Sequence, residues 1–350
     1  MFKGLKSVVA LVFMLGQAWA VVSAAPTQDA SIPLSYRWGR GIDWPAQNLN
    51  IGGYFNSSYQ KPERLTDQLA LDSLSVFVTW SPHQRLRFFT EVEADEWLST
   101  ERVQSLNNSI QAERLYVDIL ASESTSFRLG KFLTPIGRWN IIHAAPLIWT
   151  TSRPLVNQPG SFSPHLNGLM LIQKFEIAEL SGDFSVYADN SGEFDVFDAA
   201  LGFQNAFGGR FNLDIADEFH LGLSFINFQN EALQTRLARN NLLGVDLSWK
   251  SNGYEVAFES IYRHAEDQQG EEKGFFIQGV APLVDSVYAV GRYEYLNGTH
   301  ELIQADTKVF VAALAWRPYV PLVLKTEYRF GEDNQLLAPS GWYSSIAMFF

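Results

Sequence analysis

Short stretches in which apolar and polar residues alternate recur along most of this chain. In residues 243–249, leucine, valine, leucine and tryptophan alternate with glycine, aspartate and serine. A period of two is typical of a β-strand, because successive side chains point to opposite faces. Ser251-Asn252-Gly253 then predicts a tight turn, and residues 254–263 alternate again. The pair predicts a β-hairpin with one apolar face and one charged face.

The same pattern predicts about sixteen antiparallel strands, an even number that is typical of single-chain bacterial barrels. Residues 195–215 are interpreted as one bulged strand, although Gly208-Gly209 leaves open a turn there. Short turns alternate with longer polar loops, which predicts periplasmic turns and extracellular loops. The predicted strands are residues 49–55, 74–80, 86–94, 110–120, 127–131, 169–177, 184–188, 195–215, 219–228, 243–249, 254–263, 275–280, 287–295, 309–316, 322–330 and 341–350.

The apolar content is high, at 47% of residues, but it is spread over these short pieces. After the N-terminal segment no long apolar run occurs, which argues against a helical inner-membrane protein. A soluble all-β protein, with its apolar face inward, is the alternative. The length and the two termini favour a transmembrane barrel whose apolar face meets lipid. Aromatic residues at strand ends suit interfacial girdles: Trp80, Trp97, Trp249, Tyr262, Trp316 and Trp342.

Composition narrows the choice of partners. The formal net charge is -12, which argues against nucleic acid and against anionic membrane surfaces as partners. The chain has no cysteine, so a disulfide framework and a thiolate metal site are excluded. No motif calls for a cofactor, and none is predicted.

Both termini carry features of an exported protein. Residues 1–24 combine a basic start with a short apolar run, which predicts a cleaved signal peptide. We expect residues 25–47 to form an N-terminal periplasmic segment and residues 48–350 to form the barrel. The last ten residues, GWYSSIAMFF, resemble the closing strand of bacterial outer-membrane barrels. That resemblance implies a Gram-negative outer membrane, contact with its lipid, and recognition of Phe350 by the barrel-assembly machinery.

If the apolar positions of each strand face lipid, the positions that alternate with them face the lumen. Charged residues on lipid-facing positions would cost a few kcal/mol each at the midplane, so they are placed inside. Rings of such charges set ion preference in a water-filled lumen, although mutual pairing and solvation of the interior is the plainer alternative. The predicted lumen-facing residues include Arg85, Arg87, Glu91, Glu93, Asp95, Arg114, Arg263 and Arg292.

The longest segment without strand character is residues 132–166, the third long loop. It is too rich in tryptophan, isoleucine and leucine for disorder, and a long loop is usually functional. We expect it to fold inward and narrow the pore. No aspartate or glutamate occurs in residues 124–175, so its bases either favour anions or pair with lumenal carboxylates. The predicted pore-constriction residues are Arg128, Lys131, Arg138 and Arg153.

The segment RLGKFLTPIGRWN, residues 128–140, resembles part of the phosphate-selective porin O/P-like group of outer-membrane porins. Arg128, Gly130, Lys131, Pro135 and Gly137 carry this resemblance, together with Phe132. It implies a 16-stranded porin, commonly trimeric, with an inward third loop. Phosphate selectivity in that group needs an arginine ladder and clustered lysines, and a dense lysine cluster is missing here.

These observations predict a porin that passes small hydrophilic solutes or ions, with anion preference at the constriction as an open point. Monomer and trimer both remain open. A non-conducting barrel that serves as adhesin or scaffold is one alternative. A sugar- or nutrient-specific channel is another, with Trp139 and Trp149 available to stack on a ring. An enzyme is not predicted, since the GxSxG and HExxH motifs are absent and the histidines are scattered.

Overall fold

The computed structural model describes residues 34–350 except 101–109, 159–161, 190–202, 231–238, 267–269, 299–305 and 333–336, and the side chains of Glu96, Trp97 and Gln204. The predicted signal peptide, residues 1–24, and the first part of the 25–47 segment lie outside these residues. Within them, no helix is long and apolar enough to cross a membrane.

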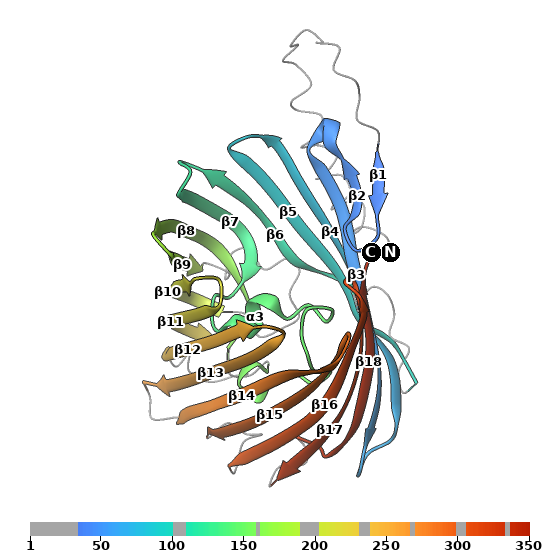
Figure 1. Cartoon of the computed structure of the whole chain (residues 1–350). Helices are drawn as coiled ribbons and strands as arrows, with labels where there is room; N and C mark the ends of the chain where they lie inside the picture. Colours follow the sequence, from blue (N-terminus) through green and yellow to red (C-terminus); the bar gives the residue numbers. More distant parts are fainter. Residues whose placement is uncertain are drawn as a thin grey trace, which may run out of the picture. The chain divides into compact units, whose positions relative to one another are not determined.

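Sixteen antiparallel strands, β3 to β18, form a closed barrel (Figure 1). Each strand pairs with the next, and β18 pairs with β3 from Tyr54↔Phe349 to Pro62↔Gly341, which closes the sheet. The predicted fold class is confirmed. The strands are β3 (Leu49–Pro62), β4 (Gln68–His83), β5 (Leu86–Ser99), β6 (Ile110–Leu120), β7 (Thr125–Leu133), β8 (His165–Ile177), β9 (Leu180–Asp189), β10 (Phe203–Ile215), β11 (Phe219–Asn230), β12 (Arg239–Ser251), β13 (Tyr254–Ala265), β14 (Glu271–Val284), β15 (Val287–Gly298), β16 (Thr307–Tyr319), β17 (Leu322–Glu332) and β18 (Gly341–Phe349).

The turn chemistry of the sequence explains the hairpins. Asn252 and Gly253 both have positive φ, 51° and 84°, which is the conformation that a two-residue hairpin turn requires. A turn at Gly208-Gly209 is wrong, because both glycines pair within β10, with Ile226 and Phe225 of β11. The predicted start of that strand, near Asp195, lies outside the described residues. Strand β3 extends seven residues beyond its predicted end at Phe55, to Pro62.

Two shorter strands precede the barrel. Strand β1 (Ser35–Arg37) pairs with β2 (Gly41–Trp44), and β2 pairs with the first residues of β3. A 3-10 turn, η1 (Pro45–Gln47), links this hairpin to β3. Part of the predicted N-terminal segment therefore extends the barrel sheet.

Alternation along the strands gives the wall its two faces. In β16, Phe310, Leu314 and Trp316 are exposed outward, while Val311 and Ala315 are buried inward. The expectation of a charged interior is therefore only half right: several strands carry apolar side chains on the inner face as well. Those side chains are covered by the connection between β7 and β8, which enters the barrel with helix α3 (Arg138–Ile142) and the 3-10 turn η2 (Leu155–Asn157) (Figure 1). The predicted inward third loop is confirmed.

Candidate functional site: the lumen and its third loop

The third loop, residues 134–164, enters the barrel through a glycine. Gly137 has φ 65°, and a Cβ there would lie 2.4 Å from Oε2 of Glu259 on β13. This close approach lets Glu259 accept the backbone N–H of Trp139 at 2.5 Å and the Asn157 side-chain amide at 3.1 Å. Both ends of the loop are thus attached to one wall carboxylate.

The far side of the loop is held by charged residues of β15 and β17. Glu327 accepts the N–H groups of Thr151 and Ser152 at 2.7 and 2.9 Å. Lys325 donates to the carbonyls of Ala145 and Thr150 at 3.0 and 3.1 Å. Such charge-assisted hydrogen bonds contribute about 1.5–3 kcal/mol each, and leaving a buried charge unpaired costs more. The loop therefore has a defined position against this wall.

Arg292 and Glu294 on β15 complete this attachment. Glu294 accepts the N–H of Leu155 at 2.6 Å and the Arg292 Nε–H at 2.8 Å, and both side chains have no exposed surface. Arg292 also donates to the carbonyl and hydroxyl of Ser152. We call Glu259, Arg292, Glu294, Lys325 and Glu327 the anchoring residues, because each bonds the loop to the wall.

Apolar side chains fill the space between the loop and the wall. Ile136, Leu155 and Val156 of the loop are buried with side chains from β7 to β16 in one cluster inside the barrel. Burying a side chain of this size is worth about 1.5–3 kcal/mol. The wall members include Phe203, Ile226, Phe228, Leu242, Phe276, Val290, Leu296, Val309 and Val311. This part of the lumen is a core rather than a passage.

A cavity remains between the loop and strands β3 to β6. Its volume is about 570 Å³, and most of the residues that line it have charged or polar side chains. The wall contributes four carboxylates, and the loop contributes Arg153 and His143. The lining side chains are Tyr54, Asn56, Ser58, Gln60, Asp72, Ser73, Glu93, Asp95, Gln111, Glu113, Trp139, His143, Ala145, Ile148, Thr151, Arg153, Pro164, His165 and Lys325.

Two of these carboxylates reach the lumen through β-bulges, which sequence reasoning missed. In β4 the register slips between Ser73 and Leu71, and the extra residue, Asp72, accepts hydrogen bonds from Asn56 and Ser58 inside the barrel. In β6 the register slips between Arg114 and Ala112. The extra residue there, Glu113, accepts a hydrogen bond from His165 Nε2 at 2.8 Å. Strict alternation from Arg114 places Glu113 on the outer face. The only signal for a bulge in the sequence is that a charged residue would then stand on the apolar face.

Arg153 is the loop cation that lines the cavity. Its guanidinium lies 4.9 Å from the centre of the Trp139 ring, and its Nη2 donates to Asn140 at 3.4 Å. Among the described residues, no carboxylate oxygen forms an ion pair with it. Burial lowers the pKa of Arg153 to about 10, which leaves it charged at neutral pH. Burial likewise lowers the pKa of His143 to about 4, so that side chain is neutral there.

The other predicted constriction residues do not line this cavity. Arg128, on β7, forms a bidentate pair with Asp118 at 2.7 and 2.9 Å, and its guanidinium lies over the Tyr116 ring. Lys131 is buried within the wall, and Arg138 begins α3. The structure thus places Arg153 in the lining of the cavity and the other three outside that lining. Their role at a constriction stays a prediction.

The predicted lumen-facing residues have different surroundings. Glu93 and Asp95 line the cavity, whereas Glu91 is paired with Arg114 at 2.5 Å. Arg263 pairs with Glu272 at 2.9 Å, and Arg292 is sealed beneath the loop. Arg87 stands opposite Asp118 in the wall, and Arg85 lies in the turn before β5 rather than in a strand. Of the two tryptophans considered for sugar stacking, Trp139 lines the cavity, while Trp149 donates to Glu255 at 3.1 Å on the wall.

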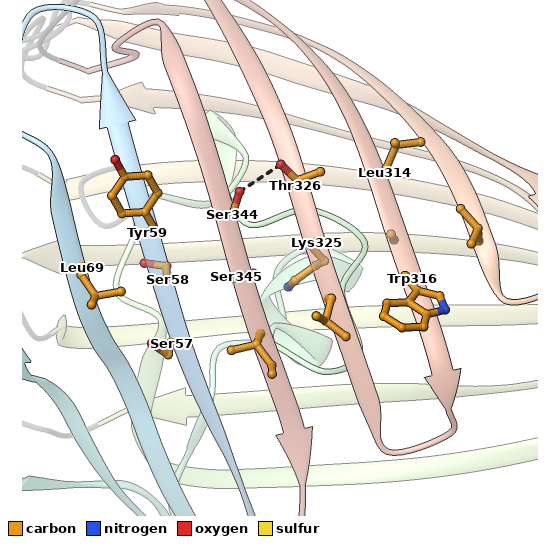
Figure 2. Close-up of a pocket in the computed structure, with 14 residues that line it drawn as sticks. Ser57, Ser58, Tyr59, Leu69, Leu314, Trp316, Lys325, Thr326, Ser344 and Ser345 are labelled. Carbon is orange, nitrogen blue, oxygen red and sulfur yellow. Dashed lines mark hydrogen bonds between the residues drawn. The ribbon is translucent and has the colours of Figure 1, made fainter.

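The outer surface has a groove of its own, of about 550 Å³, across β3, β4 and β15 to β18 (Figure 2). Tyr59, Leu69 and Trp316 border it, and the hydroxyls of Thr326 and Ser344 share a hydrogen bond of 2.9 Å in its floor. The groove lies on the face opposite to the lumen. It therefore belongs to the outer surface of the barrel.

Comparison with known proteins supports the fold assignment. No protein-family model matches the chain. An uncharacterized protein of Aquifex aeolicus is 21% identical over 342 residues, covering 81% of this chain and 75% of that protein. Among solved structures, Salmonella typhi OmpF has a TM-score of 0.64 at 12% identity, over 91% of this chain and 99% of that one.

Further structural neighbours are also outer-membrane proteins. An anion-selective porin from Comamonas acidovorans has a TM-score of 0.61 at 11% identity, over 86% of this chain and 99% of the porin. The trimer form of Vibrio cholerae OmpT has a TM-score of 0.61 at 10% identity, over 86% of this chain and 99% of that one. The fold is that of the bacterial outer-membrane porins. At these identities the likeness shows the fold alone, and it does not confirm the phosphate-selective O/P group.

Proposed function

We propose that this protein is a passive diffusion porin of the Gram-negative outer membrane, for small hydrophilic solutes or ions. The observation that carries the proposal is the charged cavity left open between the third loop and β3 to β6. A scaffold or adhesin has no need of a loop that is fixed so as to leave one side of the lumen polar. Planar-bilayer recording of the purified protein tests this. Stable conductance steps are expected, and silence in independent preparations would favour the scaffold.

For charge selectivity, we propose a preference for cations over anions of similar size. The acid-free stretch of residues 124–175 suggested anion preference, but Arg153 is its one arginine or lysine in the cavity lining. Lys325 also lines the cavity, yet its ammonium group is bonded to two loop carbonyls. Four acidic side chains line the cavity beside these two cations, so acidic groups outnumber basic ones and we expect a negative local potential. The comparison porin from Comamonas acidovorans is described as anion-selective, which makes the measurement informative.

Reversal potentials in a salt gradient test this charge assignment. An ion that passes about 4 Å from a fixed charge changes in energy by about 1 kcal/mol in water, which corresponds to roughly a fivefold change in permeability. Arg153→Gln should therefore increase cation preference, and Asp95→Asn should reduce it. Lys273→Gln is the matched control. It also removes one positive charge, but Lys273 is exposed on the face of β14 that points away from the lumen. If Arg153→Gln and Lys273→Gln give the same potentials, Arg153 is not at the narrow part of the pore.

For assembly, we propose a homotrimer in which a second copy covers the groove shown in Figure 2. Small side chains such as Ser57 and Ser344 allow close approach of another wall, and hydroxyls are unusual on a surface that meets only lipid. Ser344→Trp should fill the groove and shift the protein toward monomer on native gels. Leu243→Trp, on β12 and far around the barrel, should leave assembly unchanged. A parent protein that is monomeric would refute this proposal.

We propose that export proceeds through a cleaved signal peptide, residues 1–24, and insertion through Phe350. In support, the backbone of Phe350 pairs with Gly53 of β3 at 2.9 and 3.1 Å. N-terminal sequencing of purified protein tests the cleavage, which should leave a chain that begins near Ala25. Deletion of Phe350 should reduce the amount of heat-modifiable protein in the outer membrane. Normal amounts would show that insertion does not need this residue.

A further inference from the structure

The β1–β2 hairpin occupies the edge that β18 leaves free. Strand β18 pairs with β3 only from Tyr54 onward, and β2 pairs with the earlier residues Leu49 to Ile51. The turn of the hairpin lies against the β16–β17 turn, where a Cβ on Gly39 would be 2.5 Å from Pro321. The hairpin thus continues the barrel wall at the end where the short turns are.

The strand register gives this hairpin two distinct faces. Cross-strand partners share a face, and Tyr36, Ile42, Ile51 and Val78 are successive partners across β1 to β4. Trp44, Leu49 and Trp80 form a second apolar row of the same kind. These rows contain the outward positions of β3 and β4. The apolar face of the hairpin is therefore continuous with the outer surface of the barrel.

The opposite face of the hairpin is polar. Asp43 pairs with Asn50 across β2 and β3, and Asn50 donates to its carboxylate at 2.7 Å. Arg37 of β1 forms an ion pair with the same carboxylate. Arg40, in the turn, offers its carbonyl to Asn50 at 3.0 Å. The hairpin is therefore amphipathic. A hairpin with water on both sides would gain nothing from having one apolar face.

The apolar face is uncovered among the described residues. Exposed fractions are 59% for Tyr36, 36% for Ile42 and 43% for Trp44, close to the 37% of Ile51 on the barrel itself. Trp38, in the hairpin turn, packs on Tyr319 with ring centres 5.2 Å apart. Tyrosine and tryptophan prefer the boundary between headgroups and hydrocarbon. This composition matches an interfacial position better than a wholly aqueous one.

We propose that the β1–β2 hairpin lies in the membrane interface at the short-turn end of the barrel, with Tyr36, Ile42 and Trp44 in contact with lipid. The phospholipid leaflet at that end covers the apolar face of the hairpin. The proposal rests on the barrel spanning a membrane. A second copy of the chain is the rival occupant, and the experiment below separates the two.

Because the chain has no cysteine, single substitutions give one labelling site each. Tyr36→Cys and Ile42→Cys report the apolar face, and Ser35→Cys, one residue away, is the matched control on the polar face. Leu243→Cys, outward on β12, reports the barrel itself. Each variant is labelled with an environment-sensitive fluorophore and reconstituted in phosphatidylcholine vesicles that carry nitroxide lipid. Quenching by nitroxide lipid and by aqueous iodide is then compared.

At positions 36 and 42 we expect at least threefold stronger quenching by nitroxide lipid than at position 35, with iodide showing the reverse order. If positions 36 and 42 behave like position 35 while position 243 is quenched by lipid, the hairpin lies in water and the proposal fails. If shielding at 36 and 42 appears only at high protein-to-lipid ratio, a second copy covers the face, which also overturns it. Absence of lipid quenching at position 243 would instead contradict the proposed membrane barrel.

Discussion

Glu327 offers the sharpest test of how the third loop is held. It is buried and accepts two backbone N–H groups, from Thr151 and Ser152. In Glu327→Gln, one carboxylate oxygen becomes an amide nitrogen, which faces an N–H donor and cannot accept it. The substitution keeps the side-chain volume and removes one charge and one acceptor. The loop should therefore detach more often, while the barrel remains folded.

The size of the effect follows from these two contacts. Loss of one charge-assisted hydrogen bond costs about 1.5–3 kcal/mol, and the N–H left without a partner in a buried place costs about 1–3 kcal/mol. These terms overlap, so we take roughly 3 kcal/mol as the total. Since 1.4 kcal/mol is a factor of ten, the detached fraction should rise roughly a hundredfold. The remaining anchoring residues keep the attached state in the majority.

Single-channel recording in planar bilayers measures this change. Glu327→Gln should show frequent fluctuations to a larger conductance, because the loop obstructs less of the lumen when detached. Trypsin should also cleave after Arg138 faster than in the parent protein. Asp95→Asn is the matched control, since it removes a lumenal carboxylate that lines the cavity opposite the loop. It should change ion preference without adding fluctuations.

The outcome that refutes the reasoning is equally clear. If Glu327→Gln and Glu327→Ala both record with the noise and the trypsin sensitivity of the parent, Glu327 does not hold the loop. The apolar cluster beneath the loop would then fix its position unaided. A variant that fails to fold into the membrane is recognised by loss of heat modifiability. If Glu327→Ala fails in this way, the recordings of the milder Glu327→Gln decide the test.

Two further predictions concern the same loop. Gly137→Ala should detach it as well, because the added Cβ meets the Glu259 carboxylate and the residue has φ 65°; equal trypsin cleavage after Arg138 in variant and parent would contradict this. The pKa of His143 is lowered to about 4 by burial, against about 6.5 for a free histidine, so a detached loop binds a proton that the attached loop refuses. Attachment should therefore weaken as pH falls from about 6.5 to about 4, and conductance fluctuations should rise across that window in the parent but less in His143→Gln.

The wall could be predicted from the sequence because alternation is a local property. Residues 243–249 and 254–263 show their strands and the turn between them without reference to distant parts of the chain, and β12 and β13 follow that pattern. The inward loop was predictable from its length and apolar content. Its acid-free composition showed which charges it carries, although not which of them point to the lumen.

The lining of the cavity depended on non-local features. Arg153 lines it and Arg138 does not. Which arginine lines the cavity depends on the fold of the loop, and Gly137 of that loop packs against the distant carboxylate of Glu259. Asp72 and Glu113 face the lumen because each strand contains one unmatched residue. A bulge cannot be placed from a single strand, because it is defined by the register of its partner. The charge balance of the cavity therefore could not be predicted from the sequence.

Most anchoring residues contact the backbone of the loop rather than its side chains. The carboxylates of Glu259, Glu294 and Glu327 accept N–H groups that any residue except proline provides, and Lys325 donates to main-chain carbonyls. Side chains such as Arg153 and Trp139 are thus exchangeable without loss of the attachment. The residues that fix the loop are therefore different from the loop side chains that line the cavity. If the proposed channel function holds, these side chains can be exchanged one at a time to change ion preference, while the same wall serves as a fixed frame for engineered pores.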